Sequence, residues 1–167
     1  MRYILGPCIF KYPGQITQGR KEQMMYDPNN VFGKILRGEI PSARVYEDAH
    51  TVVFMDVMPQ ALGHTLVVPR APSRNLLDAD GATLAHVLPV VQKIARAAKA
   101  AFAADGISVM QFNEAAGGQS VFHLHFHVIP RFEGVALRPH TDVMEKPDVL
   151  AAHAEALRAA LSAIART

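Results

Sequence analysis

Residues 122–129 constrain this chain more than any other segment, because they read Phe-His-Leu-His-Phe-His-Val-Ile, with histidines and bulky apolar residues in alternation. Successive side chains of a β-strand point to opposite faces, so a strand here places His123, His125 and His127 on one face. The other face is expected to pack against a core and carries Phe122, Leu124, Phe126 and Val128. Side chains two positions apart are separated by about 6.6 Å, which lets three imidazoles converge on one small tetrahedral group or one metal ion.

Three neighbouring imidazoles can divide the work of a reaction. A neutral imidazole is a good nucleophile near neutral pH, and a protonated one donates a proton. If His125 attacks a phosphorus atom, His123 and His127 flank it, where they contact the non-bridging oxygens or the departing group. One ring nitrogen of His125 must then be held by a hydrogen bond, so that the other nitrogen presents its lone pair.

The segment before the histidines supplies groups that bind negative charge. Asn113 and Gln119 carry side-chain amides, Ser120 carries a hydroxyl, and glycines 117–118 let an anion approach backbone N–H groups closely. A glycine pair alone is ordinary turn chemistry. Directly before the alternating histidines, it indicates an anion site.

The composition limits the class of protein. The 167 residues, 50% of them hydrophobic, suit one domain with a substantial core. The 17 basic and 15 acidic residues leave a net charge of +2, so no basic surface for nucleic acid is expected. We find no run of about 18 apolar residues and expect no membrane span. The single Cys8 excludes an internal disulfide and fits a cytoplasmic protein.

The residue patterns predict an α+β fold. Residues 1–25 contain scattered glycine and proline and are expected to form an irregular extension, with one domain over 26–167. A short helix capped by Asn30, a long amphipathic helix over 80–104 and a C-terminal helix over 147–165 are predicted. A mostly antiparallel five-stranded sheet is expected, with strands at 44–47, 51–56, 64–68, 107–113 and 120–129.

The histidine segment resembles the signature of the histidine triad (HIT) family, His-φ-His-φ-His-φ-φ with φ apolar, which residues 123–129 match without exception. Shorter stretches resemble other parts of the same family and follow in the order that the family uses. They are Phe32-Gly33-Lys34-Ile35, Gly38-Glu39-Ile40-Pro41, Phe54-Met55-Asp56, Pro59-Gln60-Ala61, Gly63-His64-Thr65-Leu66-Val67-Val68-Pro69 and Gly118-Gln119-Ser120. The resemblance covers roughly residues 28–132.

The resemblance implies a HIT-like fold and a nucleotide hydrolase or transferase that acts at an α-phosphorus. Its substrate would be a dinucleoside polyphosphate or a nucleoside phosphoramidate. By similarity, His125 is the nucleophile and carries a transient nucleotidyl group that water later removes. His127 contacts the phosphate and assists the leaving group, His123 supports the geometry, and His64 lies behind the nucleophile.

The same resemblance assigns the nucleotide-binding residues. Asp56 would take the ribose hydroxyls, while Asn113, Gln119 and Ser120 would bind phosphate oxygens. The base would be enclosed by five apolar residues, although a base pocket and a core use the same side chains. These residues are Val31, Phe32, Ile35, Phe54 and Leu66.

Partners and cofactors are implied in the same way. A homodimer is expected, with two small sheets joined edge to edge. No cofactor is required, and a divalent metal would enter only as the substrate's counter-ion. Many bacterial members carry a Cys-x-x-Cys pair for structural zinc before the first helix, where this chain has residues 27–32, so that zinc is not expected. Pro130-Arg131-Phe132 and the long C-terminal region resemble the dinucleoside polyphosphate hydrolase branch and related bacterial proteins. Arg131 is expected either to contact a polyphosphate or, more simply, to face solvent.

Two other function classes fit the same residues. Three histidines also make a zinc site, although no carboxylate follows the triad in register. Full activity in the presence of a chelator would exclude this class. A nucleotide-binding partner or regulatory protein with incidental catalysis is the second alternative, and release of mononucleotide from a substrate would argue against it.

Overall fold

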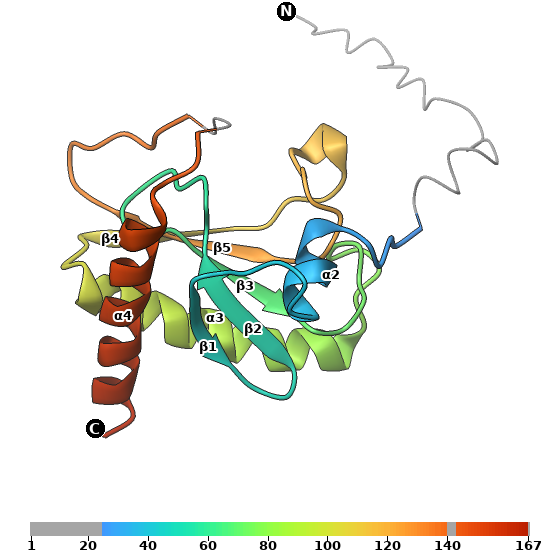
Figure 1. Ribbon diagram of the computed structural model, residues 1–167, viewed down its shortest axis with the longest axis horizontal. Helices are drawn as coiled ribbons and strands as arrows, with labels where there is room; N and C mark the ends of the chain where they lie inside the picture. Colours follow the sequence, from blue (N-terminus) through green and yellow to red (C-terminus); the bar gives the residue numbers. More distant parts are fainter. Residues whose placement is uncertain (1–24, 140–142, 167) are drawn as a thin grey trace, which may run out of the picture.

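The computed structural model describes residues 25–139 and 143–166, so the predicted extension lies outside the described residues except for Met25. Five antiparallel strands form one sheet in the order β1-β2-β3-β5-β4, which confirms the predicted α+β class (Figure 1). The elements are α2 (Val31–Leu36), β1 (Arg44–Glu47), β2 (Thr51–Met55), β3 (Thr65–Pro69), α3 (Gly81–Ala101), β4 (Gly106–Met110), a 3-10 turn (Ala115–Gly117), β5 (Phe126–Arg131) and α4 (Pro147–Ile164).

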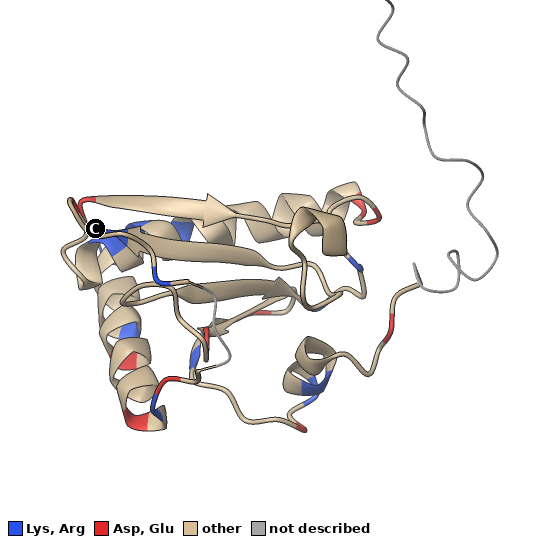
Figure 2. Cartoon of the chain, turned by 90° about the horizontal axis from the view of Figure 1, so that it is seen from above, with Lys and Arg blue, Asp and Glu red and all other residues tan. Residues whose placement is uncertain are grey.

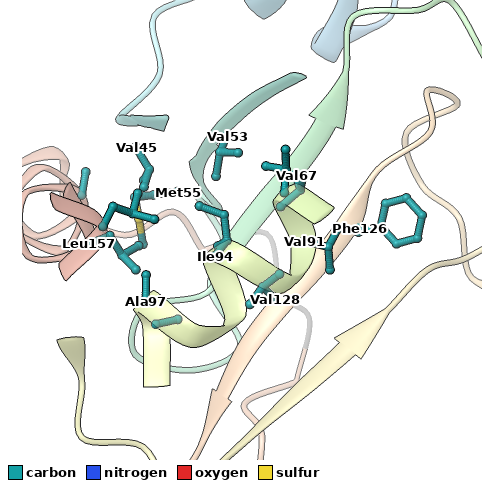
Figure 3. Packing of buried hydrophobic residues seen from close by; sticks show 14 of the residues in the cluster. Val45, Val53, Met55, Val67, Val91, Ile94, Ala97, Phe126, Val128 and Leu157 are labelled. Carbon is teal, nitrogen blue, oxygen red and sulfur yellow. The ribbon is translucent and has the colours of Figure 1, made fainter. Parts of the chain in front are cut away.

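The strands β2 and β3 are buried on both faces, and their alternation separates two apolar clusters. Val53, Met55 and Val67 point toward α3 and α4 and belong to the larger cluster. Figure 3 shows Val91 and Ile94 of α3 among these side chains. The alternate residues of the same strands point to the other face, where α2 packs; they are Val52, Phe54, Leu66 and Val68. The sheet therefore has a large helix layer on one face and a small one on the other.

Local signals place the helices as the sequence predicts. The Asn30 side chain accepts a hydrogen bond from the Gly33 N–H at 2.9 Å and caps α2. The Asp80 side chain caps α3 by accepting from the Thr83 N–H at 2.6 Å. Pro147 occupies the first turn of α4, where its missing N–H costs nothing.

Among the described residues, no helix is long and apolar enough to cross a bilayer.

Charged residues surround the sheet and leave its centre apolar. Figure 2 shows Lys, Arg, Asp and Glu interspersed on the helices and loops, with little charge along the strands. The strands β2, β3 and β4 read TVVFM, TLVVP and GISVM and contain no charged residue.

The predicted histidine strand is too long at its start. The strand β5 begins at Phe126, so His123 and His125 lie on an extended segment that has left the sheet. The pairing with β3 stops because Pro69, at the end of β3, has no N–H to donate. The Pro69 carbonyl instead accepts from the His123 ring, and the Leu124 N–H donates to the Ser73 carbonyl at 2.8 Å.

Alternation nevertheless continues through this segment, except at its first residue. Leu124, Phe126 and Val128 join the larger apolar cluster, while the histidines point away from it. Phe122 was expected on the packed face and is only half-buried, with the Arg74 guanidinium 3.9 Å from its ring centroid. The predicted fourth strand is likewise shorter than expected, because β4 ends at Met110.

Gly63, in the turn between β2 and β3, is expected to tolerate alanine poorly. It adopts a φ of +75°, and a Cβ at this position would lie 2.3 Å from the Phe102 ring. Gly38 offers a matched control, because its φ is +79° while its Cβ would meet no described atom within 4 Å beyond its neighbours. Gly38→Ala should lower the unfolding free energy by about 1 kcal/mol, from backbone strain alone. Gly63→Ala should lower it by about 3 kcal/mol, since the ring must also move. Urea denaturation measures both, and equal losses would contradict this account.

Candidate active site

The His125 ring is held in one orientation by the backbone of the histidine segment. Its Nδ1–H donates to the His123 carbonyl at 2.6 Å, which leaves Nε2 as the nitrogen with the lone pair. The residue is 3% exposed, and burial lowers the pKa of His125 below its ordinary value, against the opposing effects of this hydrogen bond and of Asp56. A buried, neutral imidazole with Nε2 unprotonated is the form that can attack an electrophile.

The His123 ring uses both of its nitrogens inside the protein. Its Nε2 lies 2.8 Å from the Pro69 carbonyl and its Nδ1 lies 2.8 Å from the Tyr26 hydroxyl. Burial lowers the pKa of His123, so the neutral ring is favoured here as well. The expectation that all three triad rings converge on one group is therefore wrong, because only His125 and His127 lie together, with ring centroids 4.9 Å apart.

His64 packs against the third triad histidine. Its Nε2 lies 2.9 Å from Nδ1 of His127, and its own Nδ1 accepts a hydrogen bond from the backbone N–H of Gln60 at 3.1 Å. Since Nδ1 of His64 is an acceptor, its Nε2 carries the proton and donates it toward His127. The Nδ1 of His127 is then an acceptor and its Nε2 is protonated. The sequence interpretation placed His64 behind the nucleophile, whereas the structure places it behind His127.

Asp56 follows β2 and is buried beside these two histidines. Its Oδ1 accepts from the Met58 N–H at 2.9 Å, and its Oδ2 lies 3.4 Å from Nε2 of His64 and 3.9 Å from Nδ1 of His127. The three side chains bring potential metal ligands within 4.8 Å of one another. No carboxylate follows the triad in register, as expected, but Asp56 brings one beside His127 from the residue after β2. Since the two nitrogens share a hydrogen bond, a cation would have to displace its proton.

The loop over 113–120 is held by side chains that the sequence interpretation did not assign. Glu114 adopts a φ of +62°, and its carboxylate accepts from Arg74 at 2.8 and 2.9 Å and from Asn75 at 2.8 Å. This ion pair lowers the pKa of Glu114 and raises that of Arg74. A non-glycine residue in this conformation is strained and persists only where its surroundings fix it.

The predicted phosphate ligands have different surroundings in this loop. The Gln119 amide is buried and makes hydrogen bonds with Arg74, Asn75, Glu114 and Val121, so it holds the loop together. The Asn113 side chain bonds to the Leu76 N–H at 3.1 Å and to Gln111 at 2.7 Å. Ser120 is exposed and lines a pocket of about 460 Å³ with Val31 and Phe122.

Four of the five predicted base-pocket residues lie in the smaller apolar cluster, next to the nucleophile. The Phe32 ring stands edge-on to His125 with centroids 4.9 Å apart and to Phe54 at 5.6 Å. The fifth, Val31, is 40% exposed and lies outside the cluster; the four within it are Phe32, Ile35, Phe54 and Leu66. Neither His125 nor His127 lines the adjacent pocket.

Arg131 lies at the far end of β5 from the histidines. At the rise of an extended chain, its Cα is about 20 Å from that of His125, and its guanidinium donates to the Ser108 hydroxyl at 3.3 Å. It is not placed to contact a phosphate held at His125.

Three residues of this site carried no clear signal in the sequence. Tyr26 precedes the first helix, and the sequence indicated no role for it beyond the first position of the predicted domain. Arg74 and Asn75 lie in a loop without periodicity. Their partners are distant in sequence, with 97 positions between Tyr26 and His123 and 40 between Arg74 and Glu114. Only the folded arrangement brings them to the triad and its loop.

The chain is similar to known proteins over the residues that form the sheet and the candidate site. A family model described as HIT domain matches residues 37–134. "Protein hit" of Bacillus subtilis (strain 168) is 37% identical over 126 residues, which cover 72% of this chain and 87% of that protein. Adenylylsulfatase HINT3 of Arabidopsis thaliana is 32% identical over 139 residues, which cover 80% of this chain and 71% of that protein. The crystal structure of a Hit-like protein from Bartonella henselae, involved in cell-cycle regulation and with an unknown ligand, is 58% identical, with a TM-score of 0.77, and the match covers 81% of this chain and 99% of that one.

Proposed function

The chain belongs to the HIT family, and from that premise we propose that it is a nucleotide hydrolase or transferase that acts at the α-phosphorus of a nucleoside phosphate conjugate. The observation that carries the proposal is the His125 ring, buried and held by the His123 carbonyl so that Nε2 bears the lone pair. A nucleophile for phosphorus needs this tautomer and this protonation state. The name of the Arabidopsis relative, an adenylylsulfatase, supports an adenylyl compound as one substrate class.

In the first step Nε2 of His125 bonds to the α-phosphorus, and the bond from phosphorus to the leaving group breaks. The positive charge that develops on the ring is stabilised by the His123 carbonyl, which accepts the Nδ1–H. The Nε2–H of His127, fixed by the hydrogen bond from His64, donates a hydrogen bond to the phosphate or to a departing oxygen, and gives its proton to a departing amine nitrogen. In the second step water attacks phosphorus, the bond from phosphorus to Nε2 of His125 breaks, and its electron pair returns to Nε2. The proton from water goes to solvent, or restores His127 where the leaving amine took the proton of that residue.

The remaining site residues are proposed to bind the nucleotide. Ser120 would contact phosphate oxygens, with Asn113 beside it and Gln119 holding the loop in shape. The N–H groups of residues 117–119 donate within the loop, so the expected approach of an anion to them is not open in this structure. Asp56 would bind the ribose hydroxyls through its carboxylate, which also faces His64. The base would lie against the smaller apolar cluster at Phe32, and Val31 would border it.

A substrate panel tests the proposal and identifies the leaving group. Diadenosine polyphosphates, an adenosine phosphoramidate, adenylated lysine and adenylyl sulfate are compared by the release of AMP. Resemblance to the dinucleoside polyphosphate branch favours the first class, and the name of the Arabidopsis relative favours the last. Release of AMP from at least one substrate supports the proposal. Tight binding of AMP with no release from any of them would favour a binding protein instead.

The reaction should retain its rate at mildly acidic pH. Because burial lowers the pKa of His125, the nucleophile stays neutral below about pH 6.5, the ordinary histidine pKa. The value of kcat/KM is expected to stay level from pH 8 to about pH 6.5 and to decline only below it. The unfolded chain binds more protons than the folded one in that lower range, so stability also falls there as pH decreases. Circular dichroism in the same buffers separates the two effects, and a midpoint above pH 7 would contradict the prediction.

We also propose that the protein is a homodimer joined through the edge of β4. Both β1 and β4 are edge strands, but β1 carries Arg44 and Glu47 and packs against α4. The strand β4 carries no charge and exposes Val109 at 49%. Light scattering should give about twice the chain mass of 18.2 kDa. Val109→Lys should shift the mass toward the monomer, because a charge at a strand edge opposes pairing; a wild-type monomer would refute the proposal.

A further inference from the structure

Tyr26 reaches the triad from outside the residues that match the family model, which begin at residue 37. Its hydroxyl lies 2.8 Å from Nδ1 of His123, and its ring meets the imidazole edge-on with centroids 5.5 Å apart. Tyr26 is itself half-buried, while His123 is fully buried. The contact therefore lies within the packed protein, beside the first histidine of the triad.

The partners of His123 determine which of its nitrogens carries the proton. The Pro69 carbonyl can only accept, so the Nε2 of His123 at 2.8 Å must be its donor. In the neutral ring Nδ1 is then an acceptor, and the Tyr26 hydroxyl donates to it. A proton added to Nδ1 would turn this acceptor into a donor, and the Tyr26 hydroxyl would then have to rotate and accept instead.

The position of His123 decides the orientation of His125. The His123 carbonyl accepts the Nδ1–H of His125 at 2.6 Å, so a shift of His123 also turns the neighbouring ring. Phe32 stands against both rings, with centroids 4.9 Å from His125 and 6.5 Å from His123. A positive charge on His123 would also disfavour the developing charge on His125, because the two rings interact electrostatically.

We propose that Tyr26 is a positioning residue, whose hydroxyl donates to Nδ1 of His123, fixes the place of His123 and thereby holds His125 in the attacking orientation. The proposal rests on the proposed function for its effect on turnover. The state of His123 itself can be measured without any substrate. Tyr26 touches no reacting atom and acts only through His123.

Tyr26→Phe is the matched test, because it keeps the ring and removes only the hydroxyl. We expect kcat to fall about tenfold, in line with the loss of one buried hydrogen bond, with KM within twofold of wild type. The acid limb of the pH profile should move, since the hydroxyl contacts the nitrogen of His123 that would take up the second proton. In protein labelled with ¹⁵N-histidine, the Nδ1 signal of His123 should shift.

Tyr46→Phe is the control for loss of a tyrosine hydroxyl elsewhere. The Tyr46 hydroxyl donates to Asp48 at 2.9 Å, in the β1–β2 region, so its removal should leave kcat and the His123 signals unchanged. Thermal melting of both variants confirms that each is folded. Unchanged His123 signals in Tyr26→Phe would overturn the proposal, whether or not turnover falls. If wild type releases AMP from no substrate, the proposed function fails, while the His123 measurement still decides the role of Tyr26.

Discussion

His125→Ala is expected to reduce turnover about 10⁴-fold or more, the largest effect of any single substitution in this site. The reason is that Nε2 of His125 forms the bond to phosphorus, and removal of the nucleophile from a covalent mechanism costs rates of this order. The fold should persist, since the loss leaves one buried acceptor, the His123 carbonyl, without its ring donor, at a cost of about 1–3 kcal/mol. The measurement is AMP release under saturating substrate, with circular dichroism as the check on folding.

The matched control for this prediction is His86→Ala. His86 is an exposed imidazole on α3 that stacks on His50 with centroids 3.9 Å apart, away from the triad. Its loss should change turnover less than twofold. A nucleotidyl adduct on wild-type protein, found by mass spectrometry after an alkaline quench, should be missing from His125→Ala. A His125→Ala variant with the wild-type rate would exclude covalent catalysis at this residue.

His127→Leu is expected to lower kcat by about 100- to 1,000-fold, the second-largest effect. The Nε2–H of His127 is the donor proposed to stabilise the phosphate and the leaving oxygen, and removal of one such donor has effects of this size in other enzymes. Leucine also leaves the Nε2–H of His64 without the acceptor at 2.9 Å. The rate should therefore be compared with that of His127→Gln, which keeps an N–H in a similar place and should recover at least tenfold.

The choice of substrate sharpens this test. A leaving group that departs as a weakly basic anion, such as nitrophenolate, needs less stabilisation than a more basic one. With an adenylyl nitrophenyl ester the loss in His127→Leu should shrink to about tenfold. An equal loss with every leaving group would mean that His127 contacts the phosphate alone. Equal rates for the leucine and glutamine variants would contradict the donor role.

The sequence predicted the α+β class and the helices of the fold well, because they depend on local patterns. Asn30 and Asp80 mark helix starts through their own side chains, and the alternation in β2 and β3 divides two faces. The predicted start of β5 was wrong, because the length of a paired strand depends on the neighbouring strand, here β3. Pro69 ends the ladder on β3, and no pattern within residues 120–125 reports it.

The candidate site was predictable only for residues whose role depends on type and spacing. The alternation in the sequence identified the three histidines of the triad. The hydrogen bonds that set the tautomers of His64 and His123 come from Gln60, Pro69 and Tyr26. Two of these partners act through backbone atoms, which any residue could supply. The prediction that the three rings converge was also wrong. His123 lies before the start of β5, and both of its ring nitrogens bond to protein groups.

The two helix layers differ in size, so the two faces of the sheet are expected to differ in their resistance to local unfolding. The six residues of α2 cover the nucleophile, while α3 and α4, with 21 and 18 residues, cover the opposite face. Detaching a short helix exposes far less apolar surface than detaching a long one, so its free-energy cost lies well below that of global unfolding. Local opening at α2 is therefore expected to be more frequent than opening at α3 or α4, and it would leave intact the buried scaffold that orients the imidazoles.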